Sequence, residues 1–365
     1  MRCSGCGRFQ SRIHDSSERW IRDLPIFDAE THLLVHRRRV QCLRCGPKLE
    51  RLDWLDRYSR VTCRLAESVA RLCSILPIKH VAEFYGLSWD QVKALDKADL
   101  EARLGPVDLD GVDVILMDEF ALHKGHRYAT VIAEPSTKRV LWVGRGRSRL
   151  DIRPFFELLG EHGCRRIKAV GMDMNSAYDL EVRLHCPRAA IVYDLFHVVA
   201  KYGREVIDRV RVDEANRLRQ DKKARRVVKS SRWLLLRNRS NLHRREDRVR
   251  LKELLQANRQ LMTVYILRDD LKQLWRYRYP GAALRFWRGW YSRAIRSRIP
   301  ALKRFARILK GYLPGILAHA RWPLSTSLLE GMNNKIKVIK RMAYGFRDEA
   351  YFFLKIRAAF PGIPG

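Results

Sequence analysis

The chain contains 365 residues and carries a formal net charge of +33, with a pI of about 10.4. Its length and its 46% content of hydrophobic residues allow two or three domains with buried cores. The positive charge far exceeds what solubility requires and indicates a polyanionic partner, DNA or RNA, while no apolar run is long enough to span a membrane.

Residues 1–50 contain two Cys-x-x-Cys pairs, which predict a small metal-binding module. The four cysteines are Cys3, Cys6, Cys42 and Cys45. The chain has no signal-peptide pattern, so we expect a cytoplasmic protein, associated with the nucleoid through DNA, whose cysteines are metal ligands or free thiols. Four thiolates leave no open coordination position, so the expected Zn²⁺ is structural. A run of arginines before the second pair provides candidate DNA contacts: Arg37, Arg38 and Arg39.

Residues 51–105 show the pattern of three short helices. Apolar residues recur at helical spacing in TCRLAESVARLCSIL, and a proline then restarts the chain into IKHVAEFYG. Gly86 is expected to end the second helix, and Ser88 to cap the third. Two helices joined by a tight turn that contains glycine predict a helix-turn-helix that binds DNA.

Residues 106–204 are expected to form the first part of an α/β catalytic domain. Three strand-like segments, VDVILMDEF, RYATVIAEP and KRVLWVGRGR, are joined by short connections that suit an antiparallel meander. Two helix–strand units follow, with strands in RRIKAVGMDMN and AAIVYDLFHVV. This order predicts an RNase H-like sheet in which the first and fourth strands lie side by side.

Three carboxylates stand at matching points of this predicted fold. Asp118 and Asp173 each close a buried strand, and Glu330 lies on a later helix among several cations. Ligands gather at the carboxyl ends of strands in open α/β sheets. Two strand-end aspartates and a helical glutamate can hold a pair of divalent ions for in-line phosphoryl transfer on nucleic acid. Glu119, which follows Asp118, is expected to face away because neighbours on a strand point to opposite sides.

Residues 205–322 are rich in arginine and helical in pattern, which predicts an α-helical insertion. Arg225 and Arg226 are candidate contacts to the phosphate backbone. The aromatic residues in LRFWRGWYSRA could stack on an unpaired base, but core packing is the preferred interpretation for most of them. Residues 323–365 are expected to supply the final helices of the catalytic core and further candidate DNA contacts: Lys335, Lys337, Lys340 and Arg341.

These motifs, taken together over nearly the whole length, resemble the insertion-sequence transposases of the ISL3 family within the DDE superfamily. The most specific motifs are YDLFH and EGMNNKIKVIKRMAYGF. The resemblance implies a retroviral-integrase-type core that uses Mg²⁺, or Mn²⁺, to cleave the ends of a mobile element and join them to target DNA. It also implies that the terminal inverted repeats are recognised by the zinc module and the helix-turn-helix, and that at least a homodimer assembles on DNA.

Carried over to this sequence, the resemblance makes Asp118 the first acidic residue of the catalytic triad and Glu330 the third. Two residues compete for the second position. Strand order favours Asp173, with Asp194 and His197 forming a separate D-x-x-H motif, whereas the alternative makes Asp194 itself the metal ligand. His197 either orients Asp194 or contacts substrate phosphate. Two other functions stay open on the sequence: an RNase H-like DNA nuclease, or a DNA-binding regulator without catalytic activity.

Overall fold

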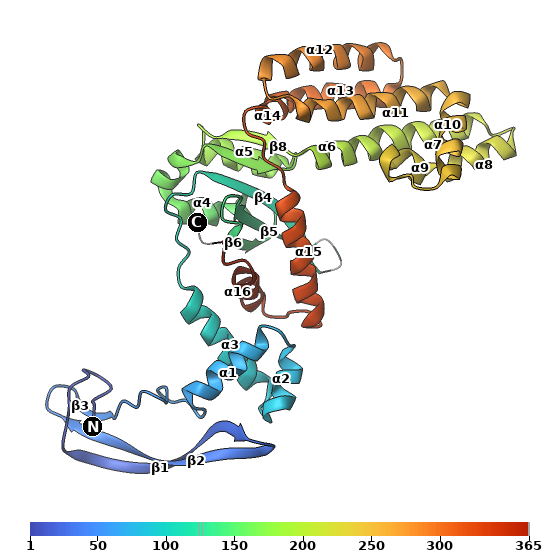
Figure 1. Cartoon of the computed structure of the whole chain (residues 1–365). Helices are drawn as coiled ribbons and strands as arrows, with labels where there is room; N and C mark the ends of the chain where they lie inside the picture. Colours follow the sequence, from blue (N-terminus) through green and yellow to red (C-terminus); the bar gives the residue numbers. More distant parts are fainter. Residues whose placement is uncertain (124, 126, 364–365) are drawn as a thin grey trace. The chain divides into compact units, whose positions relative to one another are not determined.

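A computed structural model describes residues 1–123, 125 and 127–363 of the chain (Figure 1). These residues form two compact units. One unit combines residues 1–106 with 335–359, and the other combines residues 107–334 with the segment that begins at Phe360. The expected final part of the catalytic core, residues 323–365, is therefore divided between the two units.

The first unit begins with a three-stranded antiparallel sheet in the order β1-β2-β3. Its strands are β1 (Ile13–Ile26), β2 (Ala29–Cys42) and β3 (Gly46–Leu49). Cys42 pairs with Gly46, so the second Cys-x-x-Cys pair forms the tight turn between β2 and β3. The sheet is the ribbon expected around the two cysteine pairs.

Three helices follow: α1 (Cys63–Cys73), which ends three residues before the end of its expected segment, α2 (Ile78–Tyr85) and α3 (Trp89–Leu104). Gly86 ends α2 in the left-handed region, at a φ of 64°. Ser88 begins α3 with a capping box, in which its hydroxyl accepts from Gln91 N while the Gln91 side chain accepts from Ser88 N. The predicted helix-turn-helix is confirmed.

A C-terminal helix, α16 (Glu349–Ala359), packs on α3 within the same unit. Tyr351 donates its hydroxyl proton to Asp96, and Lys355 forms an ion pair with the same carboxylate at 2.6 Å. Asp96 is 1% exposed, so these two partners compensate a charge that would otherwise be buried alone. The helix-turn-helix thus depends on chain segments roughly 250 residues apart for its core.

The second unit contains a five-stranded mixed sheet in the order β6-β5-β4-β7-β8. Its strands are β4 (Val114–His123), β5 (Arg127–Glu134), β6 (Arg139–Arg145), β7 (Ala169–Met172) and β8 (Ala190–Tyr193). The first three strands are antiparallel, and β4 then pairs with β7 in parallel. The crossover helices are α4 (Arg149–Arg166) and α5 (Ser176–His185). The expected adjacency of the first and fourth strands is confirmed.

One expected strand is shorter than its pattern indicated. The apolar run over residues 189–199 divides into β8 and a helix, α6 (Leu195–Tyr202). Asp194 causes the change, because its carboxylate accepts from Phe196 N and caps the helix. A continuous apolar run is compatible with a buried strand and with a buried helix, and the capping residue decides between them.

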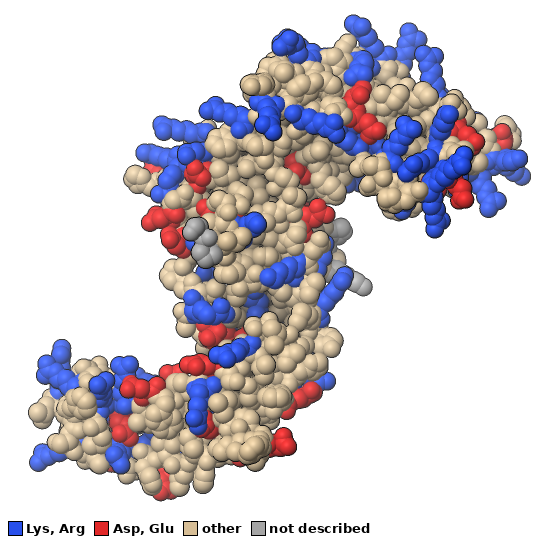
Figure 2. Space-filling view, in the orientation of Figure 1, with Lys and Arg blue, Asp and Glu red and all other residues tan. Residues whose placement is uncertain are grey.

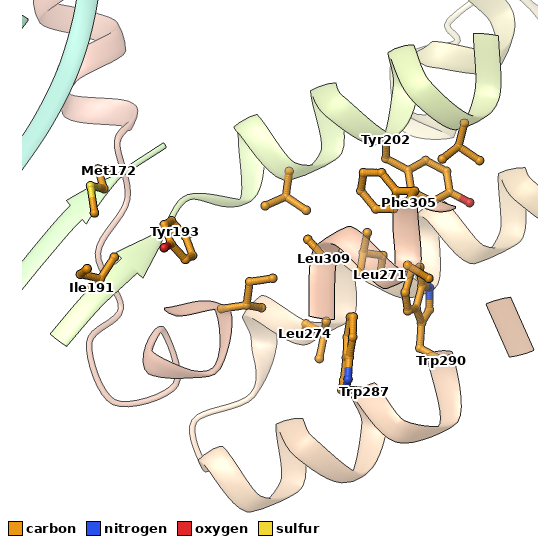
Figure 3. Packing of buried hydrophobic residues seen from close by; sticks show 14 of the residues in the cluster. Met172, Ile191, Tyr193, Tyr202, Leu271, Leu274, Trp287, Trp290, Phe305 and Leu309 are labelled. Carbon is orange, nitrogen blue, oxygen red and sulfur yellow. The ribbon is translucent and has the colours of Figure 1, made fainter. Parts of the chain in front are cut away.

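The insertion is helical, as expected, and contains α7 (Asp208–Arg217), α8 (Lys222–Ser230), α9 (Arg232–Leu236), α10 (Arg245–Ala257), α11 (Arg259–Lys272), α12 (Pro280–Arg296), α13 (Pro300–Gly311) and α14 (Leu313–Ala318). Lysine and arginine side chains cover much of its visible surface (Figure 2). Its interior is apolar, and Trp290 is fully buried with Nε1 donating to Leu267 O at 2.8 Å (Figure 3). Trp287 stacks on Trp290, which confirms the core interpretation of these aromatics. Among the described residues, no helix is long and apolar enough to cross a bilayer.

Candidate active site

The parallel pairing of β4 and β7 brings the two strand-end aspartates to the same edge of the sheet. Leu116 on β4 lies opposite Gly171 on β7. Asp118 and Asp173 each come two residues later, so their side chains leave the two strands at the same level and on the same face.

Each of these half-buried aspartates is held in an environment that disfavours its charge. Burial raises the pKa of Asp118 to about 6, and the negative charge of Asp173 adds to the rise. Burial also raises the pKa of Asp173. The nearby His197 ring acts in the opposite direction and lowers the pKa of both carboxyls. Two desolvated carboxylates that repel each other form a site that a cation would stabilise.

The hydrogen bonds at this site leave oxygen atoms without a donor. Asp118 Oδ1 accepts from Glu119 N at 2.8 Å, and Asp118 Oδ2 accepts from Asn333 Nδ2 at 2.8 Å. Two other buried oxygens, Asp173 Oδ1 and Asn333 Oδ1, receive no hydrogen bond from the described residues. Carboxylate and amide oxygens are ligands for Mg²⁺ and Mn²⁺, so the donor set fits a hard divalent cation.

Glu330 and Asn333 lie one turn apart on helix α15 (Ser327–Met342). Glu330 is exposed in the first turn, whereas Leu329 and Met332 are buried. The chain just before this helix approaches β7 closely, because a Cβ at Gly171 would lie 3.4 Å from Leu324 and 2.5 Å from Leu116. Only glycine fits there without displacing one of these leucines.

Asp194 lies in a different environment from Asp118 and Asp173. It is 7% exposed, caps α6, and accepts a second hydrogen bond from Thr326 N at 3.4 Å. Burial lowers the pKa of His319, while the charge of Asp194 opposes that change. The Asp194 carboxylate therefore joins the beginning of α6 to the beginning of α15. His197, one turn further along α6, instead lowers the pKa of Asp118 and Asp173 through its charge.

A hollow of about 400 Å³ beside Asp173 is also lined by Glu119, which was expected to face away, and by Arg147, which the sequence did not single out. Glu119 accepts from Arg147 Nη1 at 2.6 Å and from Asn175 Nδ2 at 3.4 Å. Its charge raises the pKa of both Asp118 and Asp173, so it belongs to the electrostatics of the site although it follows Asp118 on the strand. In the sequence, only the position of Glu119 directly after Asp118 indicated that it could lie near the site, and no local pattern indicated Arg147.

The four cysteines of the first unit converge at one point. Their sulfur atoms all lie within 4.8 Å of one another, and Cys6 Sγ is 3.6 Å from Cys42 Sγ. A tetrahedral Zn²⁺ with bonds of about 2.3 Å requires S···S separations of about 3.8 Å. Backbone N–H groups of Cys45 and Arg44 lower the pKa of Cys42 to about 7, while hydrogen bonding to neighbouring thiols and burial raise the pKa of Cys45 to about 12. The cluster fits zinc, which supplies the positive charge that four thiolates need.

The candidate DNA contacts differ in exposure. Arg37 is 6% exposed, and Arg39 is exposed but paired with Asp15. Arg225 and Arg226 line an open hollow of about 410 Å³ on α8, together with Lys222, Lys229 and Ser230. The remaining candidates lie on the second half of α15: Lys335, Lys337, Lys340 and Arg341. Arg37 is thus buried and poorly placed for a contact with DNA.

Three family models match consecutive parts of the chain. They are described as the zinc-finger of transposase IS204/IS1001/IS1096/IS1165, over residues 1–45, the helix-turn-helix domain of transposase family ISL3, over residues 50–98, and transposase, over residues 115–356. A zinc ribbon, a helix-turn-helix and a mixed sheet with acidic strand ends, in this order, define a DDE transposase.

The chain belongs to the ISL3 family of these enzymes, and it is a transposase of an insertion sequence element. It is 59% identical over 363 residues to the transposase for insertion sequence element IS1001 of Bordetella parapertussis, which covers 99% of this chain and 89% of that protein. It is 26% identical over 396 residues to the transposase for insertion sequence element IS1557 of Mycobacterium tuberculosis (strain ATCC 25618 / H37Rv), covering 100% and 87% of the two chains. The family expected from the motifs is confirmed.

Proposed function

We propose that Asp118, Asp173 and Glu330 bind Mg²⁺ or Mn²⁺ and catalyse both strand cleavage at the element ends and strand transfer into target DNA. The observation that supports this role is the pair of half-buried aspartates, which follow the same pair of facing residues on two adjacent parallel strands and have raised pKa values. Bound divalent ions would stabilise the attacking and leaving oxygens of the in-line displacement.

The neighbouring side chains have supporting roles in this proposal. Arg147 compensates Glu119 and limits the negative charge beside Asp173. His197 favours the ionised forms of Asp118 and Asp173, and so prepares the site for cations. Asp194 is a positioning residue, since it holds Thr326 N at the beginning of the helix that carries Glu330.

We also propose a division of labour in DNA binding. The zinc module and the helix-turn-helix would read the terminal inverted repeats, with Arg38 and Arg39 at phosphates. Arg225 and Arg226 on α8, together with the cations of the second half of α15, would contact the backbone without reading sequence. Two element ends must be brought together, so we expect at least a homodimer on DNA.

Comparison of Asp173→Asn with Asp194→Asn tests the proposed ligand set. In an assay with a pre-cut element end, a target plasmid and Mg²⁺ or Mn²⁺, Asp173→Asn should abolish joining, because it replaces an anionic cation ligand with a neutral amide. Asp194→Asn should reduce joining less, because it weakens only the anchoring of α15. The reverse result would transfer the role of second ligand to Asp194.

The same assay separates a transposase from a nuclease of the same fold. Joining of the pre-cut end to the plasmid requires attack by a DNA 3′-hydroxyl, whereas a nuclease uses only water. Cleavage of uncut ends without any joining of pre-cut ends would contradict the proposed strand transfer. Specific binding without either reaction would instead favour an inactive regulator.

A further inference from the structure

Asn333 is a buried amide whose hydrogen bonding is only half satisfied. Its side chain is 8% exposed, and Nδ2 donates to Asp118 Oδ2 at 2.8 Å. Its Oδ1 accepts no hydrogen bond from any described residue. A buried acceptor without a donor keeps the full cost of its desolvation, so a partner for Oδ1 is expected in the working protein.

The orientation of this amide follows from its partner. An ionised carboxylate can only accept hydrogen bonds, so the NH₂ group of Asn333 must face Asp118. The two hydrogen bonds to Asp118 occupy about half of the lone-pair sites of that carboxylate, one on each oxygen. Both Asp118 oxygens therefore keep capacity for another ligand, and Asn333 Oδ1 and Asp173 Oδ1 are further oxygens without a donor.

We propose that Asn333 belongs to the divalent-cation site: Nδ2 holds Asp118 in place, and Oδ1 provides a neutral oxygen for the cation or for a water bound to it. The inference rests on the proposed catalytic role of Asp118 and Asp173. A neutral amide adds an oxygen without increasing the repulsion between the two aspartates. Asn333 also follows Glu330 by one helical turn, so α15 would bring two oxygen donors to the same site.

The test is Mn²⁺ binding to the full-length, DNA-free protein, measured by calorimetry and by electron paramagnetic resonance. Asn333→Leu has a similar volume but neither polar atom, and it should weaken Mn²⁺ binding by about tenfold or more. Asn333→Asp keeps an oxygen but loses the N–H donor, and it should bind Mn²⁺ at least as tightly as the wild type. Asn334→Ala changes the adjacent exposed amide and should leave the affinity within about twofold of the wild type.

The outcomes distinguish this inference from the proposed function. If Asp173→Asn loses Mn²⁺ binding while Asn333→Leu keeps it, the cation site exists and Asn333 is not part of it. If Asp173→Asn binds Mn²⁺ as the wild type does, the proposed catalytic site itself fails. If Asn333→Asp is weakened as strongly as Asn333→Leu, Asn333 acts only by holding Asp118. Should Asn333→Leu fail to fold, the isosteric Asn333→Asp decides the question alone.

Discussion

At the scale of single residues, the two strand-end aspartates, Asp118 and Asp173, are half-buried carboxylates with raised pKa values. Asp118 is held by a backbone N–H and by an amide, neither of which carries a positive charge. Burial raises its pKa to about 6, above the ordinary value of 3.8, and these two uncharged donors do not offset that effect. In the metal-free protein, the ionised form of Asp118 therefore opposes folding, and a divalent cation would remove that penalty.

Asp118→Asn should reduce the loss of stability that the metal-free protein undergoes as the pH rises. Protonation of Asp118 favours the folded state, so the wild type loses stability as the pH rises from about 4 to about 6, and an asparagine has no such loss. Over that pH range, the free energy of unfolding of the variant should rise by about 1–3 kcal/mol relative to that of the wild type. Urea unfolding with chelator present at several pH values measures the difference.

The control for that experiment is Asp110→Asn, because the Asp110 side chain is 95% exposed. It should show no comparable pH-dependent gain. A difference between Asp118→Asn and the wild type that stays constant from pH 4 to pH 7 would contradict the raised pKa. Added Mg²⁺ should stabilise the wild type at pH 7 and have little effect on Asp118→Asn.

At the scale of elements, capping residues decide where helices begin and where the preceding strands end. Asp194 ends β8 and begins α6, and the same carboxylate anchors the chain just before α15. The ribbon of β1, β2 and β3 is organised differently, since its buried interior near the cysteines is small and includes Cys3, Val40 and Cys42. A metal ion is expected to contribute much of its stability.

Cys42→Ser should therefore reduce the zinc content of the purified protein, because the alcohol is a much weaker ligand than a thiolate. The wild type should contain about one Zn²⁺ per chain, as measured by plasma mass spectrometry. Cys63→Ser, which changes a cysteine outside the cluster, should retain the metal. Equal zinc in the wild type and in Cys42→Ser would refute the assignment.

At the scale of the whole molecule, the charge of +33 makes affinity for DNA strongly dependent on salt. Some of the basic residues form ion pairs with carboxylates, as for Arg165 with Glu161, Arg183 with Asp179 and Arg293 with Asp270. The cations around the hollow on α8 are a denser group, since the described residues that line it are four cations, Lys222, Arg225, Arg226 and Lys229, and Ser230. They should contribute more to backbone binding than paired cations do.

Neutralising Arg225, Arg226 and Lys229 together with glutamine should weaken binding to every DNA sequence by a similar factor. The slope of log affinity against log salt should fall by about 0.9 for each phosphate contact that is lost. A triple variant of Arg165, Arg183 and Arg293 changes the net charge equally and should have a smaller effect. Loss of affinity confined to the terminal repeat would show that α8 reads sequence.

The sequence alone determined the features that depend on local spacing. Two Cys-x-x-Cys pairs predict the four-sulfur cluster, Gly86 and Ser88 predict the ends of α2 and α3, and alternating strand and helix patterns predict the order of the mixed sheet. Most of these features depend on residues that are close in the chain. The four-sulfur cluster is predicted because a Cys-x-x-Cys pair is a recognisable zinc-binding motif.

Only the tertiary structure decided which distant side chains meet. Asn333 lies 215 residues from Asp118 and still forms a hydrogen bond with it. Arg37 is buried although it lies in a run of arginines, and the charge of Glu119 raises the pKa of both Asp118 and Asp173. Periodicity describes the face of an element on which a residue lies. Packing decides what that face contacts, because it depends on the shape and charge of all the elements together.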